Sequence, residues 1–437
     1  MEREKIELVK SILKEIHRGA SVEELKNRFR EVLAQISPFE IPIIEQQLLQ
    51  EGFRVEDILK LCDLHVELFR EVLEARELKG VPRGHPVELF IRENEWILKR
   101  AEVFGLYANR ILTTENPEEV RTLFNALVKM GEELRKIRVH YRKVQMLIFP
   151  YLERRGINAV PRVLWGREDQ VIVRLRRFRE LAGKALENND IDGMRGAAKL
   201  ALEISREIGE LVFRENKILY PAVYTLFSEG EWVVIDEIAG EIGWLVDVGE
   251  REWKPSAKPL YPYMVEGVVT PEQLEKLPPE FKRVVETAGI KPDEYRVKRE
   301  GDLELSTGFI NTEGVEGILR ALPLEVTYAS RDGRVRFYST SMFYKGFVRT
   351  KTIIGRRLEY CHPPRLEGLV KKVFNEVVSG AKPYREFWTR LGNRIIRVLI
   401  TPVKNSRGEI LGVLETVEDL TDVVNKPEEI KSKIMVL

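Results

Sequence analysis

Four long stretches of helical periodicity between His85 and about Val248 place the strongest constraint on the fold. Apolar side chains recur there at every third or fourth position, which is the pattern of amphipathic helices. The stretches cover residues 85–112, 117–156, 165–188 and 191–227. Consecutive long helices with short connections are typical of an up-down four-helix bundle. We therefore predict such a bundle over residues 79–250.

The segments on either side of the predicted bundle have different patterns. Residues 1–78 contain short amphipathic stretches with capping boxes, such as Ser21 with Glu24, and we predict an N-terminal helical domain there. Residues 251–300 are richer in Pro, Lys and Glu and show little periodicity, which indicates a linker.

Residues 301–428 change to strand patterns. An alternating stretch turns at Asp332-Gly333 and returns, which predicts two paired strands. A helical stretch follows, and then three strands with turns at Gly392-Asn393 and Ser406–Gly408. We predict a five-stranded antiparallel sheet with helices, followed by a tail over 429–437. The fold class is therefore multidomain, α plus α+β.

Composition limits the classes of partner and compartment. The 71 Lys and Arg residues nearly balance the 70 Asp and Glu residues, so we expect neither nucleic acid nor a membrane as partner. The chain has no long apolar run and begins with charged residues, so we expect a cytoplasmic protein. Two cysteines are too few for a disulfide framework. Abundant Glu, Lys and Arg with few Cys and Met are typical of thermophiles. The motifs of P-loop, Rossmann and serine-hydrolase enzymes are absent from the sequence, and we expect no enzyme.

Several multi-residue motifs resemble known families. The motifs "FPYLERRGI", "WG" and "FRENKILYP" resemble those of hemerythrin-like (HHE cation-binding) domains, whereas "GRRLEYCHPP" and "GEILGVLETVEDLT" resemble PAS domains. The chain as a whole is similar to a prokaryotic, archaeal-type protein with an N-terminal helical domain of unknown function, a hemerythrin-like bundle and a C-terminal PAS domain. The resemblance implies non-haem iron in the bundle. It also implies a small ligand or redox cofactor between the PAS sheet and its helices.

The resemblance also assigns candidate metal ligands, but their set is incomplete. A carboxylate-bridged iron pair needs imidazoles and carboxylates from all four helices. Val144, Gln170 and Leu211 stand at three places where the family has ligands. The candidates that remain are His85, Glu93, His140, Glu168 and Glu215.

The helical spacing of apolar neighbours indicates that Glu93, His140, Glu168 and Glu215 face the bundle interior. A buried carboxylate needs a compensating partner, which is a metal, an arginine or lysine, or another polar side chain. We expect a degenerate bundle whose polar core is paired internally. Iron in a dinuclear or altered site is the alternative.

In the PAS-like segment the candidate pocket residues are aromatic and polar side chains whose faces the pattern does not determine. They are Tyr328, Phe337, Phe343, Cys361, His362 and Trp388. Haem ligation by His362 and redox sensing by Cys361 are two interpretations of the Cys-His pair. The one we favour is that "CHPP" forms the turn into the next helix.

These patterns predict a non-enzymatic sensory or regulatory protein. Its PAS domain would sense a small ligand or redox state and signal through a protein partner or as a homodimer. The alternative is an iron-binding hemerythrin-like protein that senses or binds oxygen or nitric oxide.

Overall fold

The computed structural model describes residues 7, 11, 15, 78–268, 291–341 and 347–434. Its contacts divide the chain into two compact units, Met1–Tyr295 and Arg296–Leu437. Apart from those few positions, the predicted N-terminal helical domain lies outside the described residues.

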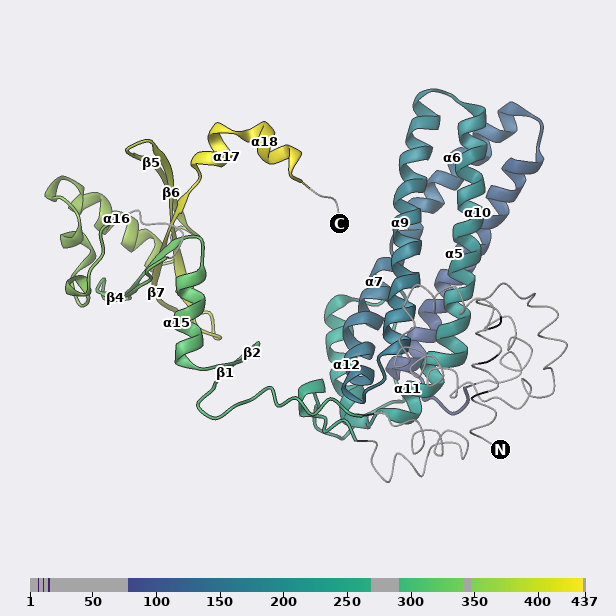
Figure 1. Ribbon diagram of the computed structural model, residues 1–437, viewed down its shortest axis with the longest axis horizontal. Coiled ribbons are helices and arrows are strands. Elements are labelled where there is room, and N and C mark those ends of the chain that lie inside the picture. The colour runs from purple at the N-terminus through teal and green to yellow at the C-terminus, as the bar shows by residue number, and fades with distance from the viewer. Residues whose placement is uncertain are drawn as a thin grey trace. The chain divides into compact units, whose positions relative to one another are not determined.

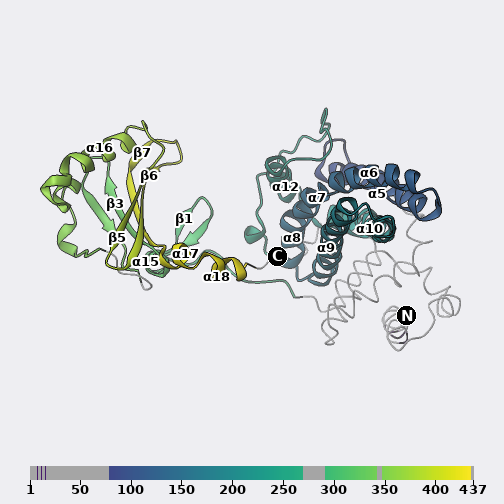
Figure 2. The same cartoon turned by 90° about the horizontal axis from the view of Figure 1, so that it is seen from above.

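The first unit contains a bundle of long helices, seen from the side in Figure 1 and from above in Figure 2. Helix α10 packs against α5 and α9, and α5 packs against α6, so the predicted helical bundle is confirmed. The elements in chain order are α5 (Pro86–Thr113), α6 (Pro117–Leu134), α7 (Ile137–Lys143), η1 (Val144–Ile148), α8 (Phe149–Arg154), α9 (Ala159–Glu187), α10 (Ile191–Arg214), η2 (Glu215–Leu219), α11 (Tyr220–Leu226), α12 (Glu229–Ile242) and the 3-10 turn η3 (Pro262–Met264).

Two of these elements, η1 and η2, are single π-helical turns inside longer helices. Each is followed by a proline, Pro150 or Pro221, in the first turn of the next α-helix. Proline has no backbone N–H and its ring collides with the carbonyl four residues earlier. The backbone widens instead, so that Phe149 N–H bonds Val144 O and Tyr220 N–H bonds Glu215 O, five residues back.

The core of the bundle consists of large apolar side chains that the helices bury completely. Phe90, Phe104, Phe124 and Ile208 all have no exposed surface. Each fully buried side chain of this kind stabilises the fold by about 1.5–3 kcal/mol relative to its exposure. Burial of these apolar side chains therefore stabilises a bundle that also contains a small polar centre.

Part of the predicted linker packs on the bundle. The Tyr151 hydroxyl donates to Leu260 O at 2.7 Å, and Arg154 Nε donates to Val265 O at 2.8 Å. In the portion of the chain that the structure describes, no helix has the length and apolarity needed to cross a membrane.

The second unit is built around the predicted five-stranded antiparallel sheet (Figures 1 and 2). Its strands lie in the order β4-β3-β7-β6-β5. A separate hairpin of β1 and β2 precedes it. The elements are β1 (Leu303–Leu305), β2 (Gly308–Ile310), α15 (Thr312–Ala321), β3 (Glu325–Ser330), β4 (Val335–Tyr338), η4 (Lys351–Ile353), η5 (Leu358–Cys361), η6 (Pro364–Leu366), α16 (Glu367–Val378), β5 (Arg385–Leu391), β6 (Arg394–Lys404), β7 (Ile410–Asp419), α17 (Thr421–Asn425) and α18 (Pro427–Ser432).

The turns of the sheet lie at the predicted glycines. Gly333, Gly392 and Gly408 have φ values of 75°, 61° and 80°, a region that residues with a side chain rarely adopt. Helix α16 packs against β6 and β7, and its fully buried Val377 clusters with Ala329 and Val413 of the sheet. The sheet and α16 form two walls of the partly open cavity described below.

Candidate functional site

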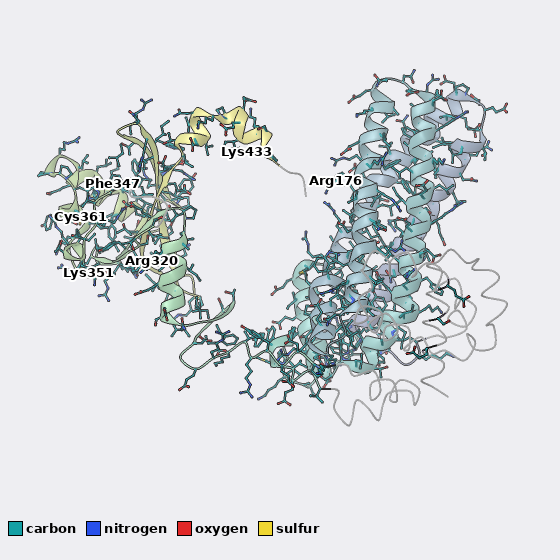
Figure 3. The ribbon with its side chains drawn as sticks, in the orientation of Figure 1. Arg176, Arg320, Phe347, Lys351, Cys361 and Lys433 are labelled. Carbon is teal, nitrogen blue, oxygen red and sulfur yellow. The ribbon has the colours of Figure 1, made fainter. Side chains whose placement is uncertain are left out.

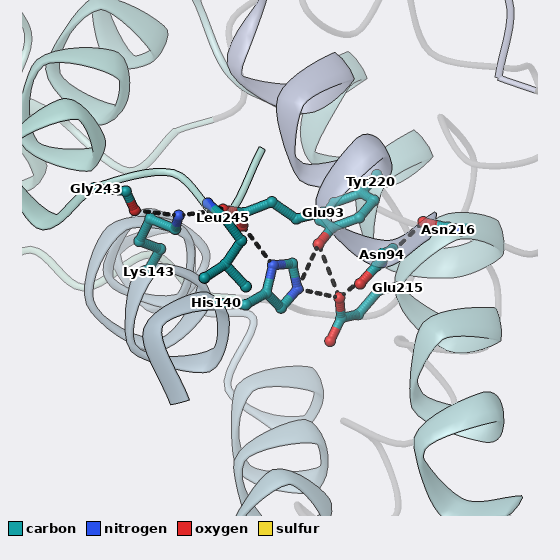
Figure 4. Close-up of polar contacts among 9 residues, drawn as sticks. All are labelled: Glu93, Asn94, His140, Lys143, Glu215, Asn216, Tyr220, Gly243 and Leu245. Atoms are coloured by element: carbon teal, nitrogen blue, oxygen red, sulfur yellow. Dashed lines mark hydrogen bonds and ion pairs between the residues drawn. The ribbon is translucent and has the colours of Figure 1, made fainter. Parts of the chain in front are cut away.

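A buried polar centre lies inside the bundle, with His140 between two carboxylates (Figure 4). His140 Nδ1 is 2.7 Å from Glu93 Oε2, and Nε2 is 2.8 Å from Glu215 Oε2. The three side chains come from α7, α5 and the first residue of η2. None is more than 1% exposed. The structure thus brings together three of the five predicted ligand residues.

Lys143 completes the side of the centre that faces α12. It follows His140 by three residues and therefore lies on the same helix face. Its Nζ is 2.5 Å from Glu93 Oε1 and 2.7 Å from Gly243 O, and lies 4.2 Å from the centroid of the Trp244 ring. The backbone N–H of Leu245 also donates to Glu93 Oε1, at 2.7 Å. Both oxygens of Glu93 therefore have partners.

The other carboxylate, Glu215, is held by neutral donors as well as by His140. The Tyr220 hydroxyl and Asn94 Nδ2 donate to its Oε2 at 2.8 and 2.9 Å. Asn94 Nδ2 also donates to Asn216 Oδ1 at 2.9 Å. Because Tyr220 begins the helix after the π-turn, the wider turn at Glu215 aligns its hydroxyl with the carboxylate.

The charged groups of this centre shift one another's pKa values. Burial acts to lower the pKa of His140, but the charges of Glu215 and Glu93 and the hydrogen bonds to them raise it to about 9. Burial acts to raise the pKa of Glu93, but His140, Lys143 and the Leu245 amide outweigh it and lower this pKa. Burial lowers the pKa of Lys143, and the charge of Glu93 opposes this shift. The side chains of His140 and Lys143 thus lie against the carboxyl groups of Glu93 and Glu215. A buried ion group without net charge avoids the large penalty of an isolated buried charge.

Glu168, the fourth predicted residue, lies beside this centre and is fully buried. Gln145 Nε2 donates to its Oε2 at 2.6 Å, whereas Oε1 has no hydrogen-bond partner among the described residues. Burial and the nearby charge of Glu215 raise the pKa of Glu168 to about 8. Glu168 is therefore mostly a neutral acid near pH 7, which removes the need for a compensating cation.

His85, the fifth predicted residue, does not join the centre. It caps α5, and its Nδ1 accepts from Val87 N–H at 3.1 Å. The rings of Tyr224, Trp232 and Trp253 surround it at 4.9–5.3 Å between centroids. Burial lowers its pKa to about 4. Glu93 follows His85 by eight residues, which corresponds to a rise of about 12 Å along α5, so His85 lies well away from the centre.

The residues at this centre do not fit a pair of iron ions. Such a site needs several neutral imidazoles. Among the described residues, His140 is the sole imidazole at this centre, and both of its nitrogens hydrogen-bond carboxylates. The ammonium of Lys143 lies on Glu93, where it would repel a metal cation. Val144 and Leu211, at two places where the family has ligands, are buried apolar side chains. Within the described ranges, no group of three or more His, Cys, Asp and Glu side chains is arranged to hold a metal.

Several residues of the centre were not predicted. Lys143, Tyr220, Asn94 and Gln145 supply most of its donors. The spacing of Lys143 to His140 is the one available sequence signal, since it places an ammonium next to the expected ligand.

The second candidate site is a cavity of about 620 Å³ in the sheet-containing unit. One wall is the sheet, with Ala329, Phe387 and Ile400, and the other is α16, with Val370 and Val373. Phe347 and Cys361, both labelled in Figure 3, also line it. The lining is mainly apolar, which is typical of small-molecule sites.

Of the predicted pocket residues, Cys361 and His362 line this cavity. Tyr328 and Trp388 are not among its lining residues, although their strand neighbours are; successive side chains of a strand point to opposite faces. Trp388 is 53% exposed. Phe337 lines a separate hollow beside β4, and Phe343 lies outside the described residues.

Arg349 lies on the cavity wall but is fully engaged by the protein. Its side chain is 8% exposed, and it donates to Thr327 Oγ1 at 2.8 Å, to Glu415 Oε1 at 2.9 Å and to Glu325. In the Cys-His pair, burial raises the pKa of the Cys361 thiol above its usual value. His362 Nδ1 lies 2.9 Å from Leu358 O, within the turn that leads to α16.

Comparison with known proteins identifies three segments of the chain. Residues 9–75 match a family of unknown function, DUF438; residues 85–223 match the hemerythrin HHE cation binding domain; and residues 315–421 match the PAS domain. No curated protein matches the chain. A solved structure, the crystal structure of a C-terminal domain from Streptococcus mutans, is 29% identical over 30% of this chain and 96% of that chain, with a TM-score of 0.27. The chain therefore consists of an N-terminal DUF438 segment, a hemerythrin HHE domain and a C-terminal PAS domain, in that order.

Proposed function

We propose that this protein is a non-enzymatic sensor or regulator. Its PAS domain binds a small ligand, and the protein passes the resulting change to a partner protein or to a second copy of itself. The observation that supports this most is the mainly apolar cavity of about 620 Å³ between the sheet and α16. This volume lies in the usual range for small-molecule sites, about 300–1,000 Å³.

The packing around the cavity supports a ligand-dependent change. Among the described residues, the buried apolar cluster between the sheet and α16 is small: it consists of Ala329, Val377 and Val413, with partly buried side chains such as Phe374 and Ile400 packed against it. A ligand that fills the cavity adds apolar contacts on both walls and stabilises the domain by mass action. It also favours whichever position of α16 gives the larger contact, which is how a ligand shifts a conformational equilibrium.

In this proposal the hemerythrin domain is a metal-independent scaffold. Its carboxylates are neutralised by His140 and Lys143, so the bundle keeps a polar interior without iron.

Native mass spectrometry of the full-length protein tests the proposal. Val370 lines the cavity, whereas Lys372 on the same helix is exposed. We expect a copurified or added small ligand to bind the wild type and Lys372→Trp, and to be lost in Val370→Trp because the indole fills the cavity. Equal ligand binding by both variants would place the ligand elsewhere and contradict the proposal.

A further inference from the structure

The polar groups around the PAS cavity restrict the chemistry of its ligand, provided that the cavity binds a ligand as proposed above. The cationic Arg349 offers no free charge, because Glu415 and Glu325 both accept from its guanidinium. A carboxylate placed beside Arg349 would approach these two carboxylates as well. The interior wall therefore does not favour an anionic ligand.

The other cation on the lining, Arg356, is exposed. Water screens its charge, and exposed ion pairs contribute little to binding. Neither arginine thus provides a buried cation for an acidic head group.

Of the other polar side chains on the lining, Thr327 and Glu415 accept hydrogen bonds from Arg349, and Cys361 donates to Arg357 O. Thr389 is exposed, so His362 is the half-buried polar group that we consider for a ligand. Its Nδ1 is 2.9 Å from the carbonyl oxygen of Leu358, and a carbonyl accepts but never donates a hydrogen bond. Nδ1 therefore carries a proton, and in the neutral form of the ring the lone pair lies on Nε2. The described residues make no hydrogen bond to Nε2, and the ring lines the cavity.

We infer that the cavity binds an uncharged, mainly apolar ligand with one hydroxyl or N–H group, which donates to Nε2 of His362. Side chains such as Val373, Phe387 and Ile400 contact the apolar body. A ligand of the same shape without the donor leaves Nε2 desolvated and unpaired. We expect this to weaken binding about tenfold.

Three probes of similar size test this inference by isothermal titration of the full-length protein. They are naphthol, which donates a hydrogen bond; methoxynaphthalene, which does not; and naphthoate, which is anionic at neutral pH. We expect naphthol to bind about tenfold more tightly than methoxynaphthalene, and naphthoate to bind weakest. His362→Phe should abolish the preference for naphthol without weakening methoxynaphthalene. His362→Gln, whose amide oxygen accepts a hydrogen bond, should retain part of the preference. Trp388→Phe, an exposed position on β5, is the matched control and should leave all three affinities unchanged.

The outcomes separate this inference from the proposed function. If none of the probes binds, the proposal of a ligand cavity fails with it. If they bind without preference for the hydroxyl, or if the preference survives in His362→Phe, only the inference about His362 is overturned. If naphthoate binds most tightly, the inference about His362 is overturned in favour of a contact between the carboxylate and Arg356. The last experiment is a titration with hemin. A shift of the Soret band that His362→Phe abolishes would overturn the inference about His362 in favour of metal ligation by this residue.

Discussion

Replacing Lys143 with methionine is the most direct test of how the bundle centre is stabilised. The Lys143 side chain is completely buried, and its ammonium neutralises Glu93 at 2.5 Å. Breaking a buried ion pair by removing one partner costs about 3–5 kcal/mol, because the other charge is left uncompensated. Glu93 keeps its bonds from His140 and Leu245, and methionine keeps the contact of the apolar stem. We therefore expect Lys143→Met to lower the free energy of unfolding by about 3 kcal/mol, the lower end of this range.

For a unit of this size, that loss lowers the melting temperature by about 6–12 °C. Calorimetry on the full-length protein measures the transition, and hydrogen exchange of peptides from α5 and α7 shows whether the loss is local to the centre. Lys129→Met, on the exposed side of α6, is the matched control and should change little. In a double-mutant cycle with Glu93→Gln, the two changes should be less than additive by about 2 kcal/mol, since each removes the same pair. A loss below about 1 kcal/mol for Lys143→Met would refute the role assigned to this ammonium.

Three further predictions follow from the same centre. First, bundle stability should fall as pH rises from about 6 to 9 in thermal melts. The pKa of His140 is raised from 6.5 to about 9 in the folded protein. The stability that protonated His140 contributes is therefore complete below pH 6.5 and is lost as the pH rises through 9. The pKa of Glu168, raised from 4.5 to about 8, acts in the same direction because the folded state retains a proton that the unfolded state releases. The lowered pKa of Lys143 acts in the opposite direction at higher pH, so the comparison is made below pH 9, where a rise in stability would contradict the shifts of His140 and Glu168. Second, Glu168→Gln should change stability by less than about 1 kcal/mol near pH 7, since the amide replaces a neutral acid, and chemical denaturation would disprove this with a loss above 2 kcal/mol. Third, ferrous iron or a chelator should leave the melting temperature within about 1 °C, and elemental analysis should find iron well below one ion per chain; a stoichiometric content that His140→Ala abolishes would restore the iron-binding alternative.

The sequence and the structure agree on the helical bundle, on the five-stranded sheet and on part of the centre, whereas the predicted helical stretch 117–156 divides after Leu134 into shorter elements. Periodicity located the helices and the strands, because each pattern reflects which side of its own element is buried. The same spacing placed Glu93, His140 and Glu215 inward, where the structure joins them. The sequence could not predict which side chains pair in the centre, because the partners are far apart along the chain. Lys143 and Glu93 are separated by fifty residues, and Tyr220 and His140 by eighty.

The PAS cavity illustrates a different difficulty. Tyr328 lies between Thr327 and Ala329 on β3, and Trp388 lies between Phe387 and Thr389 on β5; in both cases the flanking residues line the cavity. Alternation says that neighbours face opposite sides, but not which side holds the ligand. Tyr328 and Trp388 were plausible candidates by size, but the residues of these strands that line the cavity are their neighbours.

The charge balance of the centre leads to a final prediction about replacing it as a whole. Buried ion groups contribute little net stability, since desolvation offsets their attraction, and apolar residues of similar volume often replace them without loss. Asn94 would keep its bond to Asn216 after such a replacement. We therefore expect the combined variant Glu93→Leu, His140→Phe, Lys143→Met, Glu215→Leu and Tyr220→Phe to be more stable than Lys143→Met alone. Chemical denaturation compares the two, and a combined variant less stable than the single one would show that the network contributes stability beyond mutual neutralisation.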